Sequence, residues 1–114
     1  MFELRDGALC VVNTCGQVTH RHHPIGTRIV QVLPLGSNVV VREDYFGFPR
    51  GRSNLYCLDS DLRSVWSAET PAPTDRYANQ VAEVGGRLVC CSWEGALCTI
   101  DPVTGRILHH EFAK

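Results

Sequence analysis

The side chains best suited to binding another molecule lie close together between Glu43 and Arg52. This stretch contains three aromatic residues and two arginines, namely Tyr45, Phe46, Phe48, Arg50 and Arg52. Aromatic and arginine side chains are enriched among the residues that carry most of the binding energy of protein interfaces, because they offer a large contact area and several donors. We therefore predict that this stretch binds a partner. The alternative is that its aromatic rings fold back and plug an open edge of the fold.

The six cysteines and five histidines favour packing and surface roles over metal binding. Cys90 and Cys91 are adjacent, and neighbouring positions of a strand face opposite ways. In the cluster from His20 to His23 the same alternation places His20 and His22 together on one face. Two potential ligands on one face are too few to hold a metal ion. We predict no metal site and no cofactor.

Catalytic motifs are not recognisable in the sequence. The acidic side chains at expected turns, where aspartate commonly caps backbone amides, are Asp59, Asp61, Asp75 and Asp101. No serine has the local pattern of a nucleophile elbow, and no glycine-rich loop of the phosphate-binding kind precedes a helix. We therefore predict that the protein is not an enzyme and has no catalytic residues.

Charge and hydropathy exclude two further classes of partner. The net charge is −1 and there is no run of basic residues, which argues against binding to nucleic acid phosphates. No apolar stretch approaches the roughly 18 residues of a membrane span. Met1 to Asp6 lack the features of a secretory signal, and free thiols are normal in a reducing compartment. We expect a cytoplasmic protein that binds neither nucleic acid nor membranes.

A seven-residue pattern occurs three times in the chain. The copies are Gly7–Asn13, Ser53–Asp59 and Gly95–Asp101, spaced by 46 and then 42 residues. A period of this size is typical of a propeller blade, a four-stranded sheet that must stack on its neighbours to bury its faces. Each copy keeps a leucine at its third position. We predict that Leu9, Leu55 and Leu97 are buried equivalently.

Short apolar runs punctuated by glycine, with no dozen-residue window at the helical period, indicate an all-β fold. We predict about eleven strands, at residues 2–5, 8–13, 17–22, 28–34, 38–43, 54–59, 63–69, 77–84, 87–93, 96–101 and 105–112. The first blade lacks its innermost strand, because the repeat alignment would begin that strand before Met1. We expect one domain, residues 1–114, of about three antiparallel propeller-like blades at about 1–23, 28–69 and 77–112. This stack is either open or completed by oligomerisation.

The repeat also resembles a known family. The segment Gly95 to Ile107, and Leu55 to Asp59 followed by Trp66, resemble the repeat of quinoprotein-like (pyrroloquinoline-quinone-type) β-propellers. The resemblance implies the geometry of a blade, with leucine in the third strand, aspartate opening the turn and glycine in a left-handed position. Family propellers close with about six to eight blades, more than this chain offers. No counterpart of a quinone or calcium site is found.

The aromatic stretch is also where the repeats differ. Residues 43–52 have no equivalent in the third repeat, where Cys91 to Glu94 connects the same two strands directly. The stretch is therefore an inserted loop on a rigid scaffold, which is a common location for binding residues. Trp93 occupies the matching place in the third repeat. We predict a binding site made of Tyr45, Phe46, Phe48, Arg50, Arg52 and Trp93.

These observations favour a non-catalytic protein-binding module. The most concrete form is a small cytoplasmic inhibitor of the immunity-protein type, which neutralises a toxin by occluding its active site. An open stack of blades leaves an unpaired strand edge and uncovered apolar faces, so the partner is another protein or further copies of the chain. Two alternatives remain open. One is an oligomeric propeller that binds a small ligand such as a sugar, and the other is a subunit of a self-assembled propeller enzyme.

Overall fold

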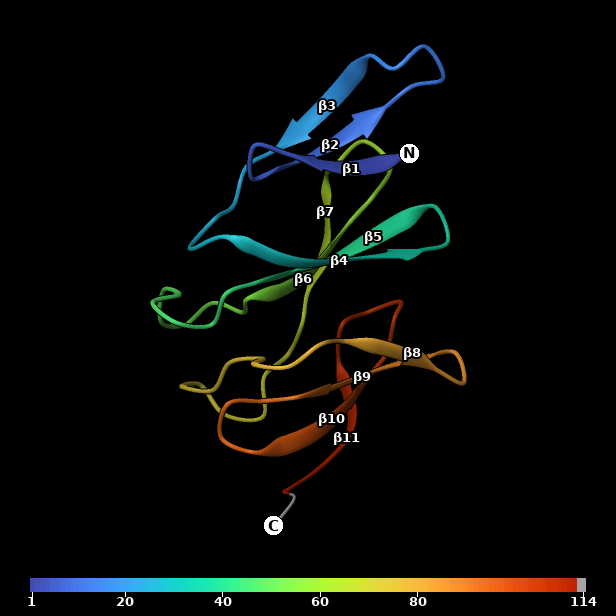
Figure 1. The fold of residues 1–114 in the computed structure, drawn as a ribbon. Helices are drawn as coiled ribbons and strands as arrows, with labels where there is room; N and C mark the ends of the chain where they lie inside the picture. Colours follow the sequence, from blue (N-terminus) through green and yellow to red (C-terminus); the bar gives the residue numbers. More distant parts are fainter. Residues whose placement is uncertain (113–114) are drawn as a thin grey trace.

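A computed structural model describes residues 1–112 of the chain and confirms the predicted all-β class. Eleven strands form three antiparallel sheets, which we call blades 1, 2 and 3 (Figure 1). Blade 1 contains β1 (Phe2–Arg5), β2 (Ala8–Val12) and β3 (Val18–His22). Blade 2 contains β4 (Ile29–Leu35), β5 (Asn38–Glu43), β6 (Leu55–Leu58) and β7 (Ser64–Ser67). Blade 3 contains β8 (Ala82–Val84), β9 (Arg87–Cys91), β10 (Ala96–Ile100) and β11 (Ile107–Phe112). No helix in residues 1–112 is long and apolar enough to cross a membrane.

Tight turns join neighbouring strands of each blade. Between β1 and β2, Asp6 and Gly7 have φ values of 50° and 79°, and between β8 and β9, Gly85 and Gly86 have values of 58° and 78°. Positive φ at both central residues is typical of the type I′ turn, whose twist matches that of antiparallel strands. The spacing of these turns therefore makes each blade a simple meander, with strands paired in chain order.

The three blades stack face to face, and each interface has its own apolar core. We call the face of a blade that is turned toward the next blade along the chain its forward face, and the opposite face its rear face. Between blades 1 and 2, Leu9 packs against Val39, Val41, Tyr56 and Leu58. Because side chains alternate along a strand, Val40, Leu55 and Cys57 then point forward, toward blade 3.

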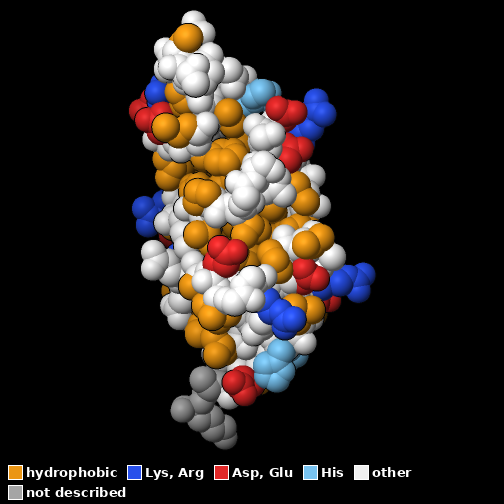
Figure 2. Space-filling model, turned by 90° about the vertical axis from the view of Figure 1, so that its right-hand side faces the viewer, with side chains coloured by type: hydrophobic (Ala, Val, Ile, Leu, Met, Phe, Trp, Pro, Cys, Tyr) orange, Lys and Arg blue, Asp and Glu red, His pale blue; other side chains and the backbone are white. Residues whose placement is uncertain are grey.

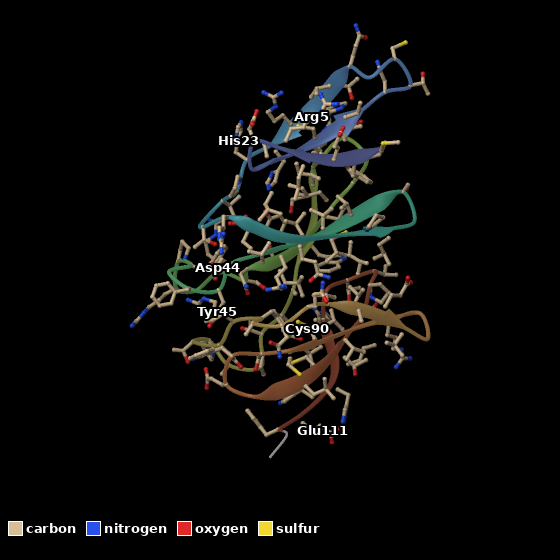
Figure 3. All side chains as sticks on the ribbon, in the orientation of Figure 1. Arg5, His23, Asp44, Tyr45, Cys90 and Glu111 are labelled. Atoms are coloured by element: carbon tan, nitrogen blue, oxygen red, sulfur yellow. The ribbon has the colours of Figure 1, made fainter. Side chains whose placement is uncertain are left out.

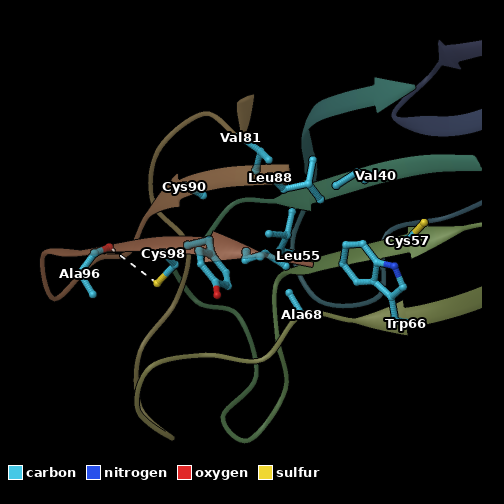
Figure 4. Close-up of a cluster of buried hydrophobic side chains, with 12 residues drawn as sticks. Val40, Leu55, Cys57, Trp66, Ala68, Val81, Leu88, Cys90, Ala96 and Cys98 are labelled. Carbon is cyan, nitrogen blue, oxygen red and sulfur yellow. Dashed lines mark hydrogen bonds between the residues drawn. The ribbon is translucent and has the colours of Figure 1, made fainter. Parts of the chain in front are cut away.

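The interface between blades 2 and 3 holds the larger core (Figure 4). The forward face of blade 2 meets rear-face residues of blade 3 that include Leu88, Cys98 and Ile100, all of them 0% exposed. Tyr77 from the connecting segment is also fully buried, and its hydroxyl donates a hydrogen bond to the carbonyl oxygen of Glu69. Blade 2 is thus covered on both faces, whereas blades 1 and 3 are each covered by one neighbour.

The strand predicted at residues 77–84 is shorter in the structure, where β8 begins at Ala82. Tyr77 forms an isolated bridge with Ser92. Beyond it, the side chain of Gln31 pairs with the backbone of Val81, accepting from its N–H and donating to its carbonyl oxygen, each at 2.8 Å. This amide replaces the ladder hydrogen bonds that Val81 would make with a neighbouring strand.

The predicted equivalence of the three leucines is wrong for Leu97. Leu9 and Leu55 are 0% exposed, but Leu97 is only partly buried. All three point forward, and within residues 1–112 no further blade covers Leu97. Leu97 is therefore less buried because it lies in the last blade of the stack, although it occupies the same repeat position as Leu9 and Leu55.

Candidate binding site

A cleft of about 440 Å³ opens between blades 2 and 3 at the end of the blades where the β5–β6 loop lies. Its lining consists of Tyr45, Phe46, Gly47, Phe48, Thr74, Arg76 and Trp93. Figure 3 labels Tyr45 near the level where the two blades meet. The inserted loop of blade 2 thus meets the β9–β10 turn of blade 3, which carries Trp93. The structure brings together four of the six predicted binding residues.

Two of the aromatic rings form a contact across the gap between the blades. The rings of Tyr45 and Trp93 stack with centroids 4.9 Å apart and an interplanar angle of 23°. Phe46 is 81% exposed and Trp93 is 63% exposed. Offset stacking of this kind holds the rings in place. The cleft therefore presents exposed aromatic surface that is partly ordered before any partner binds.

Phe48 has a different position from its neighbours. Its side chain is buried, and its ring lies so close to Gly26 that a Cβ atom there would come within 2.6 Å of it. Phe48 therefore plugs the edge of blade 2, while Phe46 projects from it. The interpretation as a binding loop therefore applies to Phe46, and the interpretation as a plug applies to Phe48.

Arg76 ties the inserted loop to the rest of the cleft. Its guanidinium Nη2 donates to the carbonyl oxygens of Phe48 at 3.3 Å and Pro49 at 3.2 Å. The carbonyl oxygen of Arg76 accepts a hydrogen bond from the backbone N–H of Trp93 at 2.7 Å. One residue thus connects the plug to the stacked ring. Sequence reasoning missed Arg76 because it lies in a connecting segment, and its role arises only where two blades meet.

Asp75 completes this connection. Its Oδ1 accepts hydrogen bonds from the backbone N–H of Arg76 at 2.8 Å and of Glu94 at 3.0 Å. The sequence predicts that Asp75 caps backbone amides in a turn; it does accept these two amide hydrogen bonds, and the structure adds that it is only 1% exposed. Its carboxylate holds the turn that presents Trp93.

A second buried carboxylate supports the base of the inserted loop. Glu43 is 0% exposed, and it accepts hydrogen bonds from the backbone N–H groups of Ile25, Gly26 and Thr27 at 2.8 to 3.0 Å. It also accepts one from the hydroxyl of Tyr56 at 2.5 Å. Burial alone would raise the pKa of Glu43, but these hydrogen bonds stabilise the charged form and together hold the pKa below its ordinary value.

Asn54 anchors the other end of the loop to the segment that connects blades 2 and 3. Its side-chain amide donates to the carbonyl oxygens of Glu43 and Tyr77, each at 2.8 Å, and its Oδ1 accepts from the N–H of Tyr77 at 2.9 Å. Asn54 is fully buried. Both ends of the inserted loop are therefore fixed, so the loop is a defined platform for Tyr45 and Phe46.

The two arginines of the inserted loop lie apart from the aromatic cleft. Arg50 is exposed and does not line it. Arg52 lines a different and smaller cleft of about 140 Å³, beside His22 and Tyr56. In that cleft the hydroxyl of Tyr56 lies 2.8 Å from Nε2 of His22. Arg76 is therefore the arginine that lines the aromatic cleft.

The opposite end of the blades has fewer side chains suited to binding. Figure 2 shows apolar side chains gathered along the middle of the face where the hairpin turns lie. A cleft of about 430 Å³ is present there, lined by Leu35, Gly36, Asn38, Val65, Pro102 and Val103. Its lining has no aromatic ring and no charged group. Nor do residues 1–112 contain a group of three or more His, Cys, Asp or Glu side chains that could hold a metal ion.

Stacked antiparallel meanders of this kind define a propeller-like protein, and comparison with known proteins agrees. The chain belongs to the family described as Domain of unknown function (DUF7957), whose model matches residues 9–112. No curated protein matches its sequence.

Two solved structures with propeller-like folds are similar to almost the whole chain. The computationally designed Ika8 protein is 15% identical with a TM-score of 0.65, and the match covers 96% of this chain and 35% of that one. BamB from Moraxella catarrhalis is 16% identical with a TM-score of 0.65, and the match covers 100% of this chain and 32% of that one. The chain therefore spans about a third of the length of either structure. At this level of identity the likeness shows the fold alone.

Proposed function

We propose that the protein is a non-catalytic protein-binding module whose binding site is the aromatic cleft between blades 2 and 3. The observation that carries this proposal is the pairing of Tyr45 with Trp93 across the two blades, beside the exposed ring of Phe46. Aromatic side chains held in a fixed position lose little conformational entropy on binding and often dominate the affinity of an interface.

The finer form of the proposal is a cytoplasmic inhibitor of the immunity-protein type, with a toxin as its partner. It is supported by an inserted loop that projects from a rigid sheet and is fixed at both ends by Glu43 and Asn54, since a preorganised loop can occlude the active site of another protein. The blades themselves are proposed to be of the quinoprotein-like type, on the basis of the leucine, aspartate and glycine positions of the repeat.

The size of the cleft favours one other function. A volume of about 440 Å³ lies in the range of small-molecule sites, and aromatic walls with a few polar groups are common in such sites. The second candidate is therefore a small ligand, such as a sugar, bound between blades 2 and 3 with Thr74 and Arg76 as polar contacts.

The proposal is tested by capture of the partner with matched variants. Immobilised wild-type protein, Phe46→Ser, Trp93→Ala and the control Val103→Ala are each exposed to an extract of the cells that produce the protein, and captured proteins are quantified by mass spectrometry. Val103 is 76% exposed and lies outside the aromatic cleft. We expect one protein to be retained by the wild type and the control, and lost with both cleft variants.

Two results would contradict the proposal. One is a partner that both cleft variants retain at the wild-type level. The other is the absence of any such protein together with a sugar or other small molecule that binds the wild type and not Trp93→Ala, which would favour the second candidate. The finer form requires in addition that the captured protein is a toxin and that one equivalent of the wild type abolishes its activity.

A further inference from the structure

The forward face of blade 3 is a largely apolar sheet surface, and no blade within residues 1–112 lies against it. Its side chains alternate with those of Leu88, Cys90 and Cys98, which point toward blade 2. On β8, β9 and β10 the face consists of Ala82, Val84, Arg87, Val89, Cys91, Leu97 and Thr99. Val84 is 59% exposed, and Leu97 is partly buried.

This face has the same layout as the forward face of blade 2, which blade 3 covers. In blade 2 the register aligns Leu33, Val40 and Cys57 across three strands. In blade 3 the register aligns Ala82, Val89 and Thr99 in the same way. Leu97 stands where Leu55 stands, and Val84 stands where Leu35 stands. A surface that is buried in one copy of the repeat is therefore open in the last copy.

The rear face of blade 1 is the counterpart at the other end of the stack. Blade 3 receives blade 2 on a rear face whose central strand presents Ala96, Cys98 and Ile100. In blade 1 the corresponding strand presents Ala8, Cys10 and Val12 at the same repeat positions. The rear face of blade 2 differs, with Asn54, Tyr56 and Leu58 at these places. The Ala8, Cys10 and Val12 side chains are at most 7% exposed in the single chain, and the ion pair of Glu3 and Arg5 on β1 lies on the same face. The central strand of blade 1 thus matches that of blade 3, whereas β1 adds two charged groups that docking would bring against the other copy.

We propose that the forward face of blade 3 docks on the rear face of blade 1 of a second copy of the chain, repeating the interface between blades 2 and 3. This inference goes beyond the proposed function, because the aromatic cleft lies at the loop end of blades 2 and 3 and not on either face. A head-to-tail contact of this type builds a ring if the rotation between copies closes, and a filament if it does not.

One pair of charges on the two faces is complementary. Glu111 of β11 is paired with Leu97, so it flanks the open face of blade 3. Arg21 of β3 is paired with Cys10, so it flanks the rear face of blade 1. Leu97 is the third residue of its copy of the repeat, and Cys10 is the fourth residue of its own copy. Docking therefore brings the carboxylate of Glu111 toward the guanidinium of Arg21 in the other copy.

The contact between Trp66 and Gly105, in the interface between blades 2 and 3, also has a potential counterpart between two copies. Trp66 of blade 2 is paired with Cys57 and lies against Gly105 in the β10–β11 turn of blade 3. In blade 3 the equivalent position is His109, which is paired with Thr99. The corresponding turn of blade 1 carries Gly16, and a Cβ atom there would meet nothing within 4 Å. The open side of Gly16 is therefore available to His109 of another copy.

Head-to-tail copies would cover the apolar residues of blade 3 that a lone chain leaves in water, which is a favourable change.

The test is the solution mass of the full chain by sedimentation velocity, with one face altered at a time. We expect wild-type protein to exceed the 12.7 kDa of one chain, and Val84→Glu and Arg21→Glu each to sediment as monomers. Each variant keeps one intact face. Mixed in equal amounts, they should form a dimer of one copy of each variant and nothing larger, because only one compatible pair of faces remains. Val103→Glu, at an exposed site outside both faces, should behave as wild type.

The proposal is overturned if wild-type protein stays monomeric at about 1 mM, where even a weak interface would be populated. It is also overturned if the mixed variants stay monomeric, or if neither substitution changes the mass of the assembly. Circular dichroism confirms that the variants are folded, and alkylation of Cys91 gives an independent measurement. Cys91 should react several-fold more slowly in concentrated wild type than in Val84→Glu. Trp93→Ala should leave the mass unchanged, which separates this proposal from the proposed function.

Discussion

The indole ring of Trp66 in blade 2 lies directly against Gly105 in blade 3. A Cβ atom at Gly105 would come within 2.6 Å of the ring, and the indole N–H donates to the carbonyl oxygen of Pro102 at 3.0 Å. Gly105 also has a φ of 76°, a left-handed conformation that other residues adopt at a cost. One turn of blade 3 is therefore shaped to receive one side chain of blade 2.

This contact predicts a large effect for a small change. Gly105→Ala should lower the free energy of unfolding by about 2–4 kcal/mol, since it combines backbone strain with overpacking against Trp66. Chemical denaturation measures the effect. Gly16→Ala, at the corresponding turn of blade 1, is the control for the strain alone, and equal losses at the two sites would show that the Trp66 contact has no energetic importance.

The three leucines of the repeat should differ in energy as they differ in burial. Leu55→Ala should cost about 2–5 kcal/mol, because it leaves a cavity in a closed core. Leu97→Ala should cost clearly less when the protein is dilute and monomeric, because its side chain is already partly in water. The comparison is made by denaturation at low protein concentration. A loss at Leu97 as large as that at Leu55 would mean that its face is covered within one chain.

The buried carboxylate of Glu43 should be essential for stability. Glu43→Ala leaves three backbone N–H groups and the hydroxyl of Tyr56 without their acceptor, and a single unsatisfied buried group costs about 1–3 kcal/mol. We therefore expect a loss of more than about 3 kcal/mol, or failure to fold. Glu83→Ala, at an exposed site on β8, is the matched control and should change stability by less than about 0.5 kcal/mol.

Stability should fall on acidification. Burial lowers the pKa of His22 and is the largest influence on it. The charge of Glu43 raises this pKa, and the charge of His23 lowers it further. A lowered pKa in the folded state means that protonation favours unfolding, so the contribution of His22 is present above its unfolded pKa of about 6.5 and is lost below it. Glu43 has the same sign and acts at lower pH, from about 4.3 downward. His22→Gln should remove the first part of the decline in melting temperature between pH 7.5 and 5.5, and an unchanged decline would contradict this assignment.

The cysteines should divide into two reactive and four protected thiols. Cys10, Cys57, Cys90 and Cys98 are buried, whereas Cys15 is exposed and Cys91 is partly buried. Burial raises the pKa of Cys57 to about 11 and that of Cys90 to about 12, which removes the reactive thiolate at neutral pH. Alkylation followed by mass spectrometry should modify Cys15 and Cys91 first. We further expect no stoichiometric zinc and no effect of reductant on the melting temperature, and a chelator that lowered it would reverse this view.

The repeat was enough to predict the all-β class, the meander order and the three strands that residues 1–23 contribute to blade 1. These features depend on local alternation and turns, as Gly85 and Gly86 illustrate. The boundary of β8 could not be predicted, because it is set by Gln31, a residue fifty positions earlier in the chain. The burial of Asp75 and Arg76 likewise depends on two blades meeting, and a single sequence carries no signal for such contacts.

The inserted loop also shows that the burial of individual side chains could not be predicted from the sequence. Its aromatic content could be read from the sequence, but Phe46 and Phe48 are two positions apart and have opposite environments. Gly26 provides the space that Phe48 fills, and no pattern in the sequence connects those two residues. Phe48 should therefore be excluded from a test of binding, because its truncation would cost stability as well as contact.

The most direct measurement is the affinity of the captured partner for Trp93→Ala, determined by isothermal titration calorimetry beside wild type and Val103→Ala. The Trp93 ring is mostly exposed, so its removal should leave the melting temperature nearly unchanged. If the aromatic cleft is the binding site, the dissociation constant should rise by at least about thirtyfold, equivalent to the loss of about 2 kcal/mol expected at a central aromatic residue. A dissociation constant equal to that of the wild type and of Val103→Ala would contradict the account.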